Sequence, residues 1–377
     1  MEKHLNIVSF NVPWPANYGG VIDVFYKIKA LHDIGVKVIL HCFEYGRPQA
    51  KELENYCEKV YYYPRRTGLI ANLTMLPYNV NSRKDPQLLK HLLENEYPIL
   101  FEGLHTCYLL NHPALRNRFK IFRECNIEHD YYRQLAGKEQ SLLHNLFYEI
   151  EAYRFKVYQK VAAAANLILS VSQSDADYLK ATFPQSHVEF VPCFHANEEM
   201  TSLEGQSDFV LYHGKLSVPE NERAALFLIE KVFCKLPCTC VVAGLEPTKR
   251  LTESISKFPN IRLEANPDEE KMRRLIREAQ VTTLVTFQGT GLKLKLLNSL
   301  FAGRHIIAND IMLEGTGLVN LCTLCNSADE MVDACLQLLT IPFTHDIITL
   351  RQAFLFPQFD CQEQARKIVR MMGEGKR

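Results

Sequence analysis

Short apolar runs alternate along this chain with segments whose apolar residues recur at helical spacing. Residues 281–310 show the pattern most clearly. The runs VTTLVTF and HIIAND at the two ends of this segment predict buried strands. Between them, an apolar stripe predicts one helix: Leu296, Leu297, Leu300 and Phe301. We expect Gly303 to adopt the left-handed conformation that ends many helices.

The same alternation extends over the whole chain. LNIVSF at 5–10, a glycine-containing loop, a helix from about 20 to 34 and the run VKVILHCF form a strand–loop–helix–strand unit, which is typical of a parallel sheet. A second series begins with FVLYHG at 209–214, after a looser stretch from about 184 to 207. With 377 residues, the chain is predicted to be an α/β protein of two domains that meet near residues 193 and 194.

Polar side chains follow two of the predicted strands in the first half. Glu102 and His105 follow one strand, and a group of four follows the next: Arg123, Asn126, Glu128 and His129. Ligands of open parallel sheets bind beyond the carboxyl ends of the strands, so we expect the two groups to converge on a ligand. The alternative is that Asn126 caps a helix and Glu128 occupies its first turn.

Small residues precede two predicted helices. Gly19 and Gly20 end the loop after the first strand, where they would let the backbone approach a ligand. The 289–304 segment begins Gly-Thr-Gly, which leaves the first N–H groups of its helix open to a phosphate. Lys295 and Asn298 lie three apart on one face of that helix. The alternative is a surface helix with solvated lysines.

The charge balance argues against one class of function. Lys and Arg total 43, as do Asp and Glu, which argues against nonspecific nucleic-acid binding. The start of the chain has no signal-peptide pattern and its 12 cysteines are scattered, so we expect a cytoplasmic protein. Residues 61–84 hold four basic residues and no acid, which predicts peripheral contact with the inner membrane face or, alternatively, ordinary packing. We expect no metal: the D-x-D at 175–177 fits the first turn of a helix capped by Ser174.

Taken in order, these segments resemble the GT-B glycosyltransferases, in particular the retaining family 4 and its family 1-like relatives. The resemblance rests on the Gly19-Gly20 loop, the Asn-Ile-Glu-His run at 126–129, the turn at Lys215 and the 289–304 helix. It implies two doubly wound, Rossmann-like domains facing across a cleft. Residues 1–193 would form the acceptor domain, residues 194–355 the nucleotide-sugar domain, and a C-terminal helix at 356–377 would cross back to the first.

The resemblance also assigns residues to the donor site. Lys215 and Asn221 stand where the family has two basic residues that clamp the donor diphosphate, and Thr290 and Asn298 stand where it has two glutamates. A family histidine that touches the donor sugar corresponds to Cys125. The donor set implied is Gly19, Gly20, Lys215, Asn221, Thr290, Gly291, Lys295 and Asn298. The catalytic set implied is Glu128, His129 and Lys295, with Glu102, His105, Arg123 and Asn126 around the acceptor or sugar.

The implied activity is transfer of a sugar from a UDP- or GDP-linked donor to a hydroxyl of a glycan or lipid-linked acceptor. Retention of configuration, independence of metals and cofactors, and a role in surface polysaccharide or glycoconjugate synthesis belong to the same expectation. Two alternatives remain at this point. One is a nucleotide-sugar epimerase or hydrolase on the same fold, and the other is a sugar-nucleotide-binding protein that has lost activity.

Overall fold

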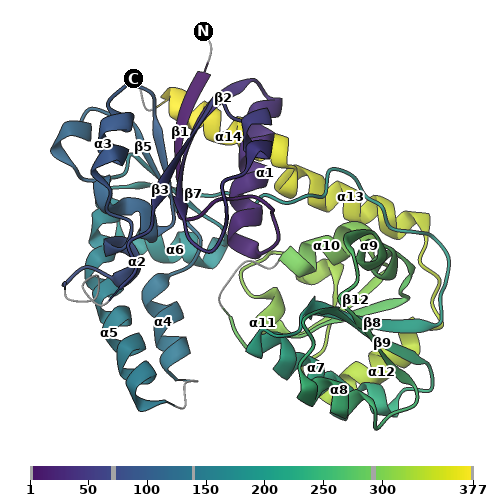
Figure 1. Cartoon of the computed structure of the whole chain (residues 1–377). Coiled ribbons are helices and arrows are strands. Elements are labelled where there is room, and N and C mark those ends of the chain that lie inside the picture. The colour runs from purple at the N-terminus through teal and green to yellow at the C-terminus, as the bar shows by residue number, and fades with distance from the viewer. Residues whose placement is uncertain (1–2, 69–73, 138–140, 290–293, 375–377) are drawn as a thin grey trace. The chain divides into compact units, whose positions relative to one another are not determined.

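The computed structural model describes residues 3–68, 74–137, 141–289 and 294–374 (Figure 1). These residues divide into two compact units. The first runs to Ala196 and takes up the chain again at Gln358, and the second lies between them. Thr290, Gly291 and Lys293 fall outside the described residues, so the predicted helix start there has no structural account.

The first unit is built on a seven-stranded, wholly parallel sheet in the order β3-β2-β1-β4-β5-β6-β7. Its strands are β1 (Lys3–Ser9), β2 (Val36–Glu44), β3 (Lys59–Pro64), β4 (Ile99–Glu102), β5 (Lys120–Glu124), β6 (Leu167–Ser170) and β7 (His187–Phe190). Its helices are α1 (Gly19–Asp33), α2 (Tyr78–Asn81), α3 (Pro86–Leu92), α4 (Glu128–Ala136), α5 (Leu142–Tyr158), α6 (Gln173–Thr182) and α14 (Cys361–Glu374).

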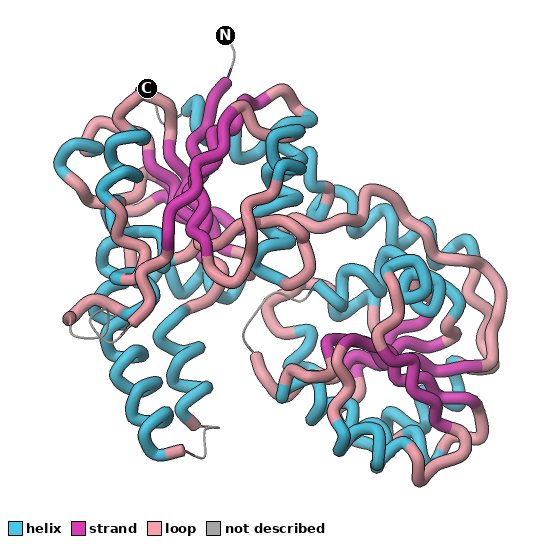
Figure 2. The backbone as a smooth tube through the Cα atoms, viewed as in Figure 1, coloured by secondary structure: helices cyan, strands magenta, loops and turns pink. Residues whose placement is uncertain are grey.

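Alternation along the strands gives this sheet two apolar faces. Leu5 and Ile7 of β1 pack in one core with α1 and α14, whereas Val8 packs in the opposite core with α3 and α5. Helices therefore cover both faces, as Figure 2 shows. The C-terminal helix α14 packs against α1, so the end of the chain belongs to the first unit.

The second unit repeats the plan with a six-stranded parallel sheet in the order β10-β9-β8-β11-β12-β13. Its strands are β8 (Phe209–Lys215), β9 (Thr239–Leu245), β10 (Ile261–Ala265), β11 (Val281–Leu284), β12 (His305–Ala308) and β13 (Thr323–Leu324). Its helices are α7 (Pro219–Lys231), α8 (Lys249–Ile255), α9 (Glu269–Glu278), α10 (Leu294–Ala302), α11 (Asp310–Leu313), α12 (Ala328–Leu338) and most of α13 (His345–Phe359).

The predicted strand–helix–strand unit at 281–310 is present as β11, α10 and β12, and the apolar stripe of α10 is buried. The prediction for Gly303 is wrong, because its backbone is not left-handed. A Cβ there would lie 2.9 Å from Ser299 O and 3.2 Å from Ile276 O. Gly303 is therefore small because carbonyl groups of α10 and α9 approach it closely, not because the helix needs a left-handed end.

Two predicted helix caps also differ. The N-cap of α4 is Ile127 rather than Asn126, and it makes no side-chain capping bond. In α6 the cap is Ser172, whose hydroxyl accepts from Asp175 N, rather than Ser174. In both cases the helix begins at a position that the sequence pattern misplaced by one or two residues.

Across the described ranges, no helix combines the length and the hydrophobicity needed to cross a bilayer.

Candidate functional sites at the two switch points

Each sheet reverses its winding direction once, between β1 and β4 in the first unit and between β8 and β11 in the second. At such a point the connections leave toward opposite faces, so the carboxyl ends of the two strands border a crevice where ligands bind. Lys215 is the last residue of β8, and Glu102 is the last residue of β4. The sequence-predicted residues thus lie at the places that the topology favours.

In the second unit, three predicted donor residues from separate segments meet beyond β8. Lys295 Nζ of α10 donates to Asn221 Oδ1 of α7 at 3.0 Å. Asn221 Nδ2 in turn donates to the carbonyl of Lys215 at 3.1 Å, and Tyr212 OH donates to the Asn221 carbonyl at 3.0 Å. Asn221, although it replaces a basic residue of the resembled family, therefore links the Lys295 ammonium to the backbone of Lys215.

Lys215 is half exposed, and its Nζ lies 3.1 Å from Glu246 Oε1. A hydrogen bond from Ser217 and the Lys215 ammonium hold the pKa of Glu246 below its usual value. An ion pair this exposed stabilises the fold little, so the carboxylate holds the Lys215 ammonium only weakly. Asn298, the remaining described member of the predicted donor set on α10, accepts from Asn197 Nδ2 at 2.8 Å.

Two residues of this region escaped the sequence analysis. His213 of β8 is buried and hydrogen-bonded to Ser299 Oγ of α10 at 2.9 Å. Burial, with Lys295 nearby, lowers the pKa of His213 to about 3, so the imidazole is neutral and ties the helix to the strand. Arg223 of α7 stacks on Phe287, just after β11, at 4.5 Å from the ring centroid. The sequence could have indicated Arg223, because it lies two residues after Asn221 in the first turns of α7.

In the first unit, Gly19 and Gly20 open α1 after the β1 loop, as predicted. A Cβ on Gly20 would lie 2.7 Å from Phe10 Cζ, so this glycine permits the ring of Phe10 to cover the helix start. Phe10 also meets the edge of the His105 ring, with centroids 6.4 Å apart. The loop after β1 and the turn after β4 are thereby joined.

One member of each predicted polar group in the first unit lies beside a member of the other. His105 Nε2 lies 3.4 Å from Glu128 Oε2, and the carboxylate is almost fully buried. His129 is also buried, and burial lowers its pKa, while its Nε2 lies 3.5 Å from Asp130 Oδ1. The Asn126 side-chain oxygen is buried without a hydrogen-bond partner among the described residues. These polar groups lie close to the carboxyl ends of β4 and β5.

Glu102 and Arg123, predicted to touch the acceptor or sugar, instead lie in the interior with no exposed surface. Lys27 Nζ lies 2.7 Å from Glu102 and 2.9 Å from Asp23, and Arg123 lies 3.1 Å from Asp23. Burial raises the pKa of Asp23, but Arg123 and Lys27 outweigh it and lower the pKa to about 2. We assign this network of two acids and two bases to fixing α1 on the sheet.

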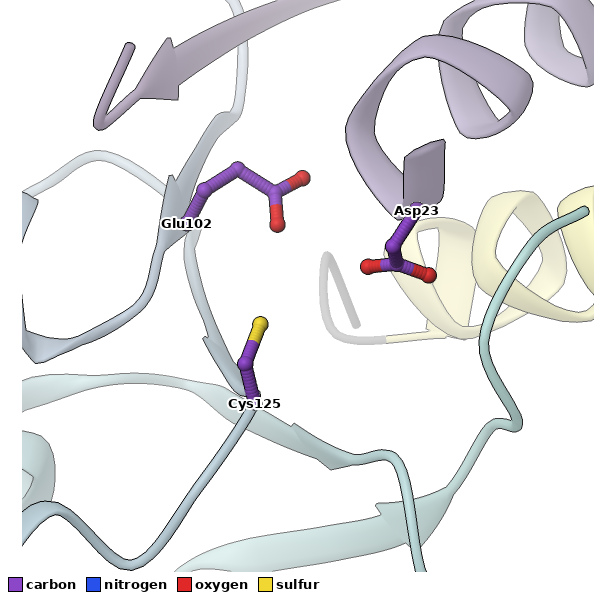
Figure 3. A group of neighbouring side chains, drawn as sticks. All are labelled: Asp23, Glu102 and Cys125. Atoms are coloured by element: carbon purple, nitrogen blue, oxygen red, sulfur yellow. The ribbon is translucent and has the colours of Figure 1, made fainter. Parts of the chain in front are cut away.

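Figure 3 shows Asp23, Glu102 and Cys125 pointing toward a common space. Their oxygen and sulfur atoms lie within 4.8 Å of one another, as ligands of a metal would. Lys27 and Arg123 already neutralise the two carboxylates, and burial raises the pKa of the Cys125 thiol well above its usual range. A protonated thiol and two paired carboxylates fit a metal ion poorly.

The basic segment 61–84 turns inward in part, which does not support a membrane-facing surface. Arg83 is 5% exposed, with Nε donating to Phe10 O at 2.9 Å. Arg65 is half-buried and lies over the Tyr45 ring at 4.1 Å. Burial and the neighbouring Arg65 lower the pKa of Arg83 to about 9. Arg65 also donates to Ser82 Oγ at 3.0 Å and to Asn79 Oδ1 at 2.6 Å, and Arg83 donates to Asn79 O at 2.6 Å, so protein groups already bind both guanidinium groups.

No family model matches the sequence. The chain is 25% identical over 349 residues to an uncharacterized 44.6 kDa protein of the cps region of Klebsiella pneumoniae, covering 87% of this chain and 88% of that protein.

Comparison with solved structures identifies the fold. Sucrose-phosphate synthase from Thermosynechococcus elongatus superposes with a TM-score of 0.71 at 14% identity, covering 99% of each chain. HepE from Anabaena, solved with UDP and glucose, superposes with a TM-score of 0.64 at 12% identity, covering 99% of this chain and 100% of that chain. The chain therefore has the fold of the GT-B glycosyltransferases, which confirms the fold that the sequence resemblance implied.

Proposed function

We propose that the protein transfers a sugar from a nucleotide sugar to a hydroxyl group of an acceptor. The observation that carries this proposal is the convergence of Lys215, Asn221 and Lys295 beyond β8, at the switch point of the second sheet. Two ammonium groups and an amide are the chemistry that a diphosphate needs. The similarity to HepE, solved with UDP, makes a uridine diphosphate sugar the first donor to test.

The charges of this site suit the transfer step. As the glycosidic bond breaks, the sugar carbon gains positive character and the leaving diphosphate gains negative charge. Lys215 and Lys295 would stabilise that charge, and the loss of one such group typically raises the barrier by on the order of 3 kcal/mol. We further propose that transfer proceeds with retention, as the resemblance to family 4 implies. We also propose that it needs no metal, because these cations supply the positive charge.

We propose that the acceptor binds the first unit beside His105 and Glu128. We propose a glycan or lipid-linked precursor of a surface polysaccharide as the acceptor. The relationship to a protein of a cps region supports that assignment.

The test of the donor site is thermal unfolding with a panel of nucleoside diphosphates and nucleotide sugars. A ligand present at 100 times its dissociation constant stabilises the folded protein by about 2.7 kcal/mol. We expect one nucleotide to raise the melting temperature of the wild type. The same nucleotide should leave the melting temperature of Lys295→Ala unchanged. The control is Lys231→Ala at the far end of α7, which should respond like the wild type. If no nucleotide shifts the wild type, the donor site is wrong.

Turnover separates the activities. Product formation that requires an acceptor supports a transferase, and NMR of the new anomeric centre reports retention or inversion. Consumption of the nucleotide sugar without an acceptor would favour an epimerase or hydrolase. Binding without any turnover would favour a binding protein. Unchanged rates after treatment with a chelator are the result expected for a metal-independent transfer.

A further inference from the structure

Helix α5 carries an open apolar face. Its large apolar side chains are among the most exposed of the described residues: Leu142 88%, Leu143 81%, Leu146 57%, Ile150 42%, Tyr153 62% and Val157 47%. The opposite face of the same helix is buried in the first unit through Ala152 and Phe155. A helix that is apolar on both faces is expected to cover one face with a partner.

The spacing of the open face indicates what kind of partner fits. From Leu143 the apolar positions follow at intervals of three, four, three and four residues. This is the a/d repeat of a coiled-coil seam, in which side chains of one helix pack between those of another. The α4–α5 hairpin extends beyond the sheet of its unit (Figure 1). In the second half of α5, Tyr153 and Val157 line a hollow together with Thr182 and Phe183. The first half of the face, from Leu143 to Ile150, is exposed and can receive a second helix.

The charges along the seam favour another copy of the same helix. α5 contains Glu149 and Glu151 against Arg154 and Lys156, so its formal net charge is 2 − 2 = 0. A helix that binds an anionic membrane surface would instead carry excess lysine and arginine. Glu149 and Lys156 are both exposed, and they lie seven residues apart on one edge of the seam.

We propose that the protein forms a two-fold symmetric dimer through α5, with the two helices antiparallel. In that arrangement Ile150 of each copy packs against Tyr153 of the other. Glu149 of each copy faces Lys156 of the other, so the same ion pair forms twice. In a parallel dimer Glu149 would face Arg154, which is already held 2.8 Å from Glu151 within its own chain. This dimer does not depend on the sugar-transfer activity.

Sedimentation velocity over a concentration series tests the proposal. The full-length wild type should shift from one to two chains per particle as the concentration rises. Ile150→Glu should remain at one chain throughout. Since Ile150 is on the surface, its variant should keep the circular dichroism spectrum and melting temperature of the dilute wild type. A wild type that stays at one chain per particle, or a variant that still associates, overturns the proposal.

A charge exchange tests the orientation. Glu149→Lys and Lys156→Glu should each weaken association, by about tenfold, and the double variant should restore it. In a parallel dimer Lys156→Glu would have no effect. Flotation with vesicles of neutral and anionic phospholipids tests whether a membrane, rather than a second copy, covers the face. Monomeric protein that floats with vesicles, and loses this on Ile150→Glu, would assign the face to a membrane instead.

Discussion

At the scale of single residues, the two units hold buried histidines that must stay neutral. His213 and His41 both have their pKa lowered to about 3, chiefly by burial. His213 bonds to Ser299, and His41 bonds to Tyr63 at 2.8 Å. An imidazole in an unfolded chain has a pKa of about 6.5. Protons therefore bind the unfolded chain at pH values where the folded protein excludes them.

This difference predicts the pH dependence of stability. Above about pH 6.5 both states of His213 are neutral and its contribution is constant. Below that value the unfolded chain takes up the proton, so stability falls by about 1.4 kcal/mol per pH unit for each such histidine, down to about pH 3. His213→Gln should flatten the slope of the unfolding free energy between pH 6.5 and pH 4. Urea unfolding at several pH values measures it.

The control for this slope is His345, whose side chain is 75% exposed. His345→Gln should leave the slope near that of the wild type. An unchanged slope in His213→Gln would mean that the buried imidazole does not remain neutral in the folded protein.

Residues also show where the sequence analysis succeeded and where it failed. Lys215 and Asn221 were assigned by the resemblance to the GT-B family, and the structure brings them together at the end of β8 and the start of α7. Glu102 and Arg123 were predicted from their positions at strand ends, but their side chains turn inward to Lys27 and Asp23. Those partners lie 75 and 100 residues away in sequence, and no local pattern reveals such a pairing.

At the scale of secondary-structure elements, short β-branched runs predicted the strands, and their alternation with helices predicted the parallel sheets. Helix surfaces were harder, and the seam of α5 was missed. Its buried and exposed faces are both apolar, so no polar stripe divides them. Glycines were ambiguous too, because a left-handed turn and a close approach both demand one.

The approach of β8 to β9 yields a prediction for one such glycine. A Cβ on Gly244 would lie 1.8 Å from the carbonyl oxygen of Gly214, so Gly244→Ala must move β8. We expect a loss of stability of about 1–3 kcal/mol, together with weaker nucleotide binding, because Lys215 ends that strand. Denaturant unfolding and nucleotide titration measure the two effects.

Gly373→Ala in α14 is the matched control, because an added Cβ there meets nothing within 4 Å. It should leave nucleotide binding intact and change stability by no more than about 1 kcal/mol, in the stabilising direction. Equal behaviour of the two variants would contradict the close contact between β8 and β9.

At the scale of the whole molecule, each unit has its own core. The clusters around β1 and β4 draw only on the first unit, and those around β8 and β9 only on the second. Units with separate cores can unfold separately, so a single unfolding free energy need not describe the chain. The single tryptophan, Trp14, packs against Phe25 in the first unit, with centroids 4.9 Å apart. Its fluorescence therefore reports on that unit.

Separate cores, with the tryptophan in the first unit only, predict how a bound nucleotide changes the two unfolding transitions. The described donor residues Lys215, Asn221 and Lys295 lie in the second unit, so a nucleoside diphosphate should raise the calorimetric transition of that unit. The melting of Trp14 fluorescence should stay where it is, because mass action stabilises only the unit that binds. With Lys295→Ala, neither signal should move. A nucleotide that raises the Trp14 transition as much as the calorimetric one would mean that the two units unfold together or that the nucleotide binds the first. Repeating the scan with Gly244→Ala separates these cases, since weakening the second unit lowers the Trp14 transition only if the units are coupled.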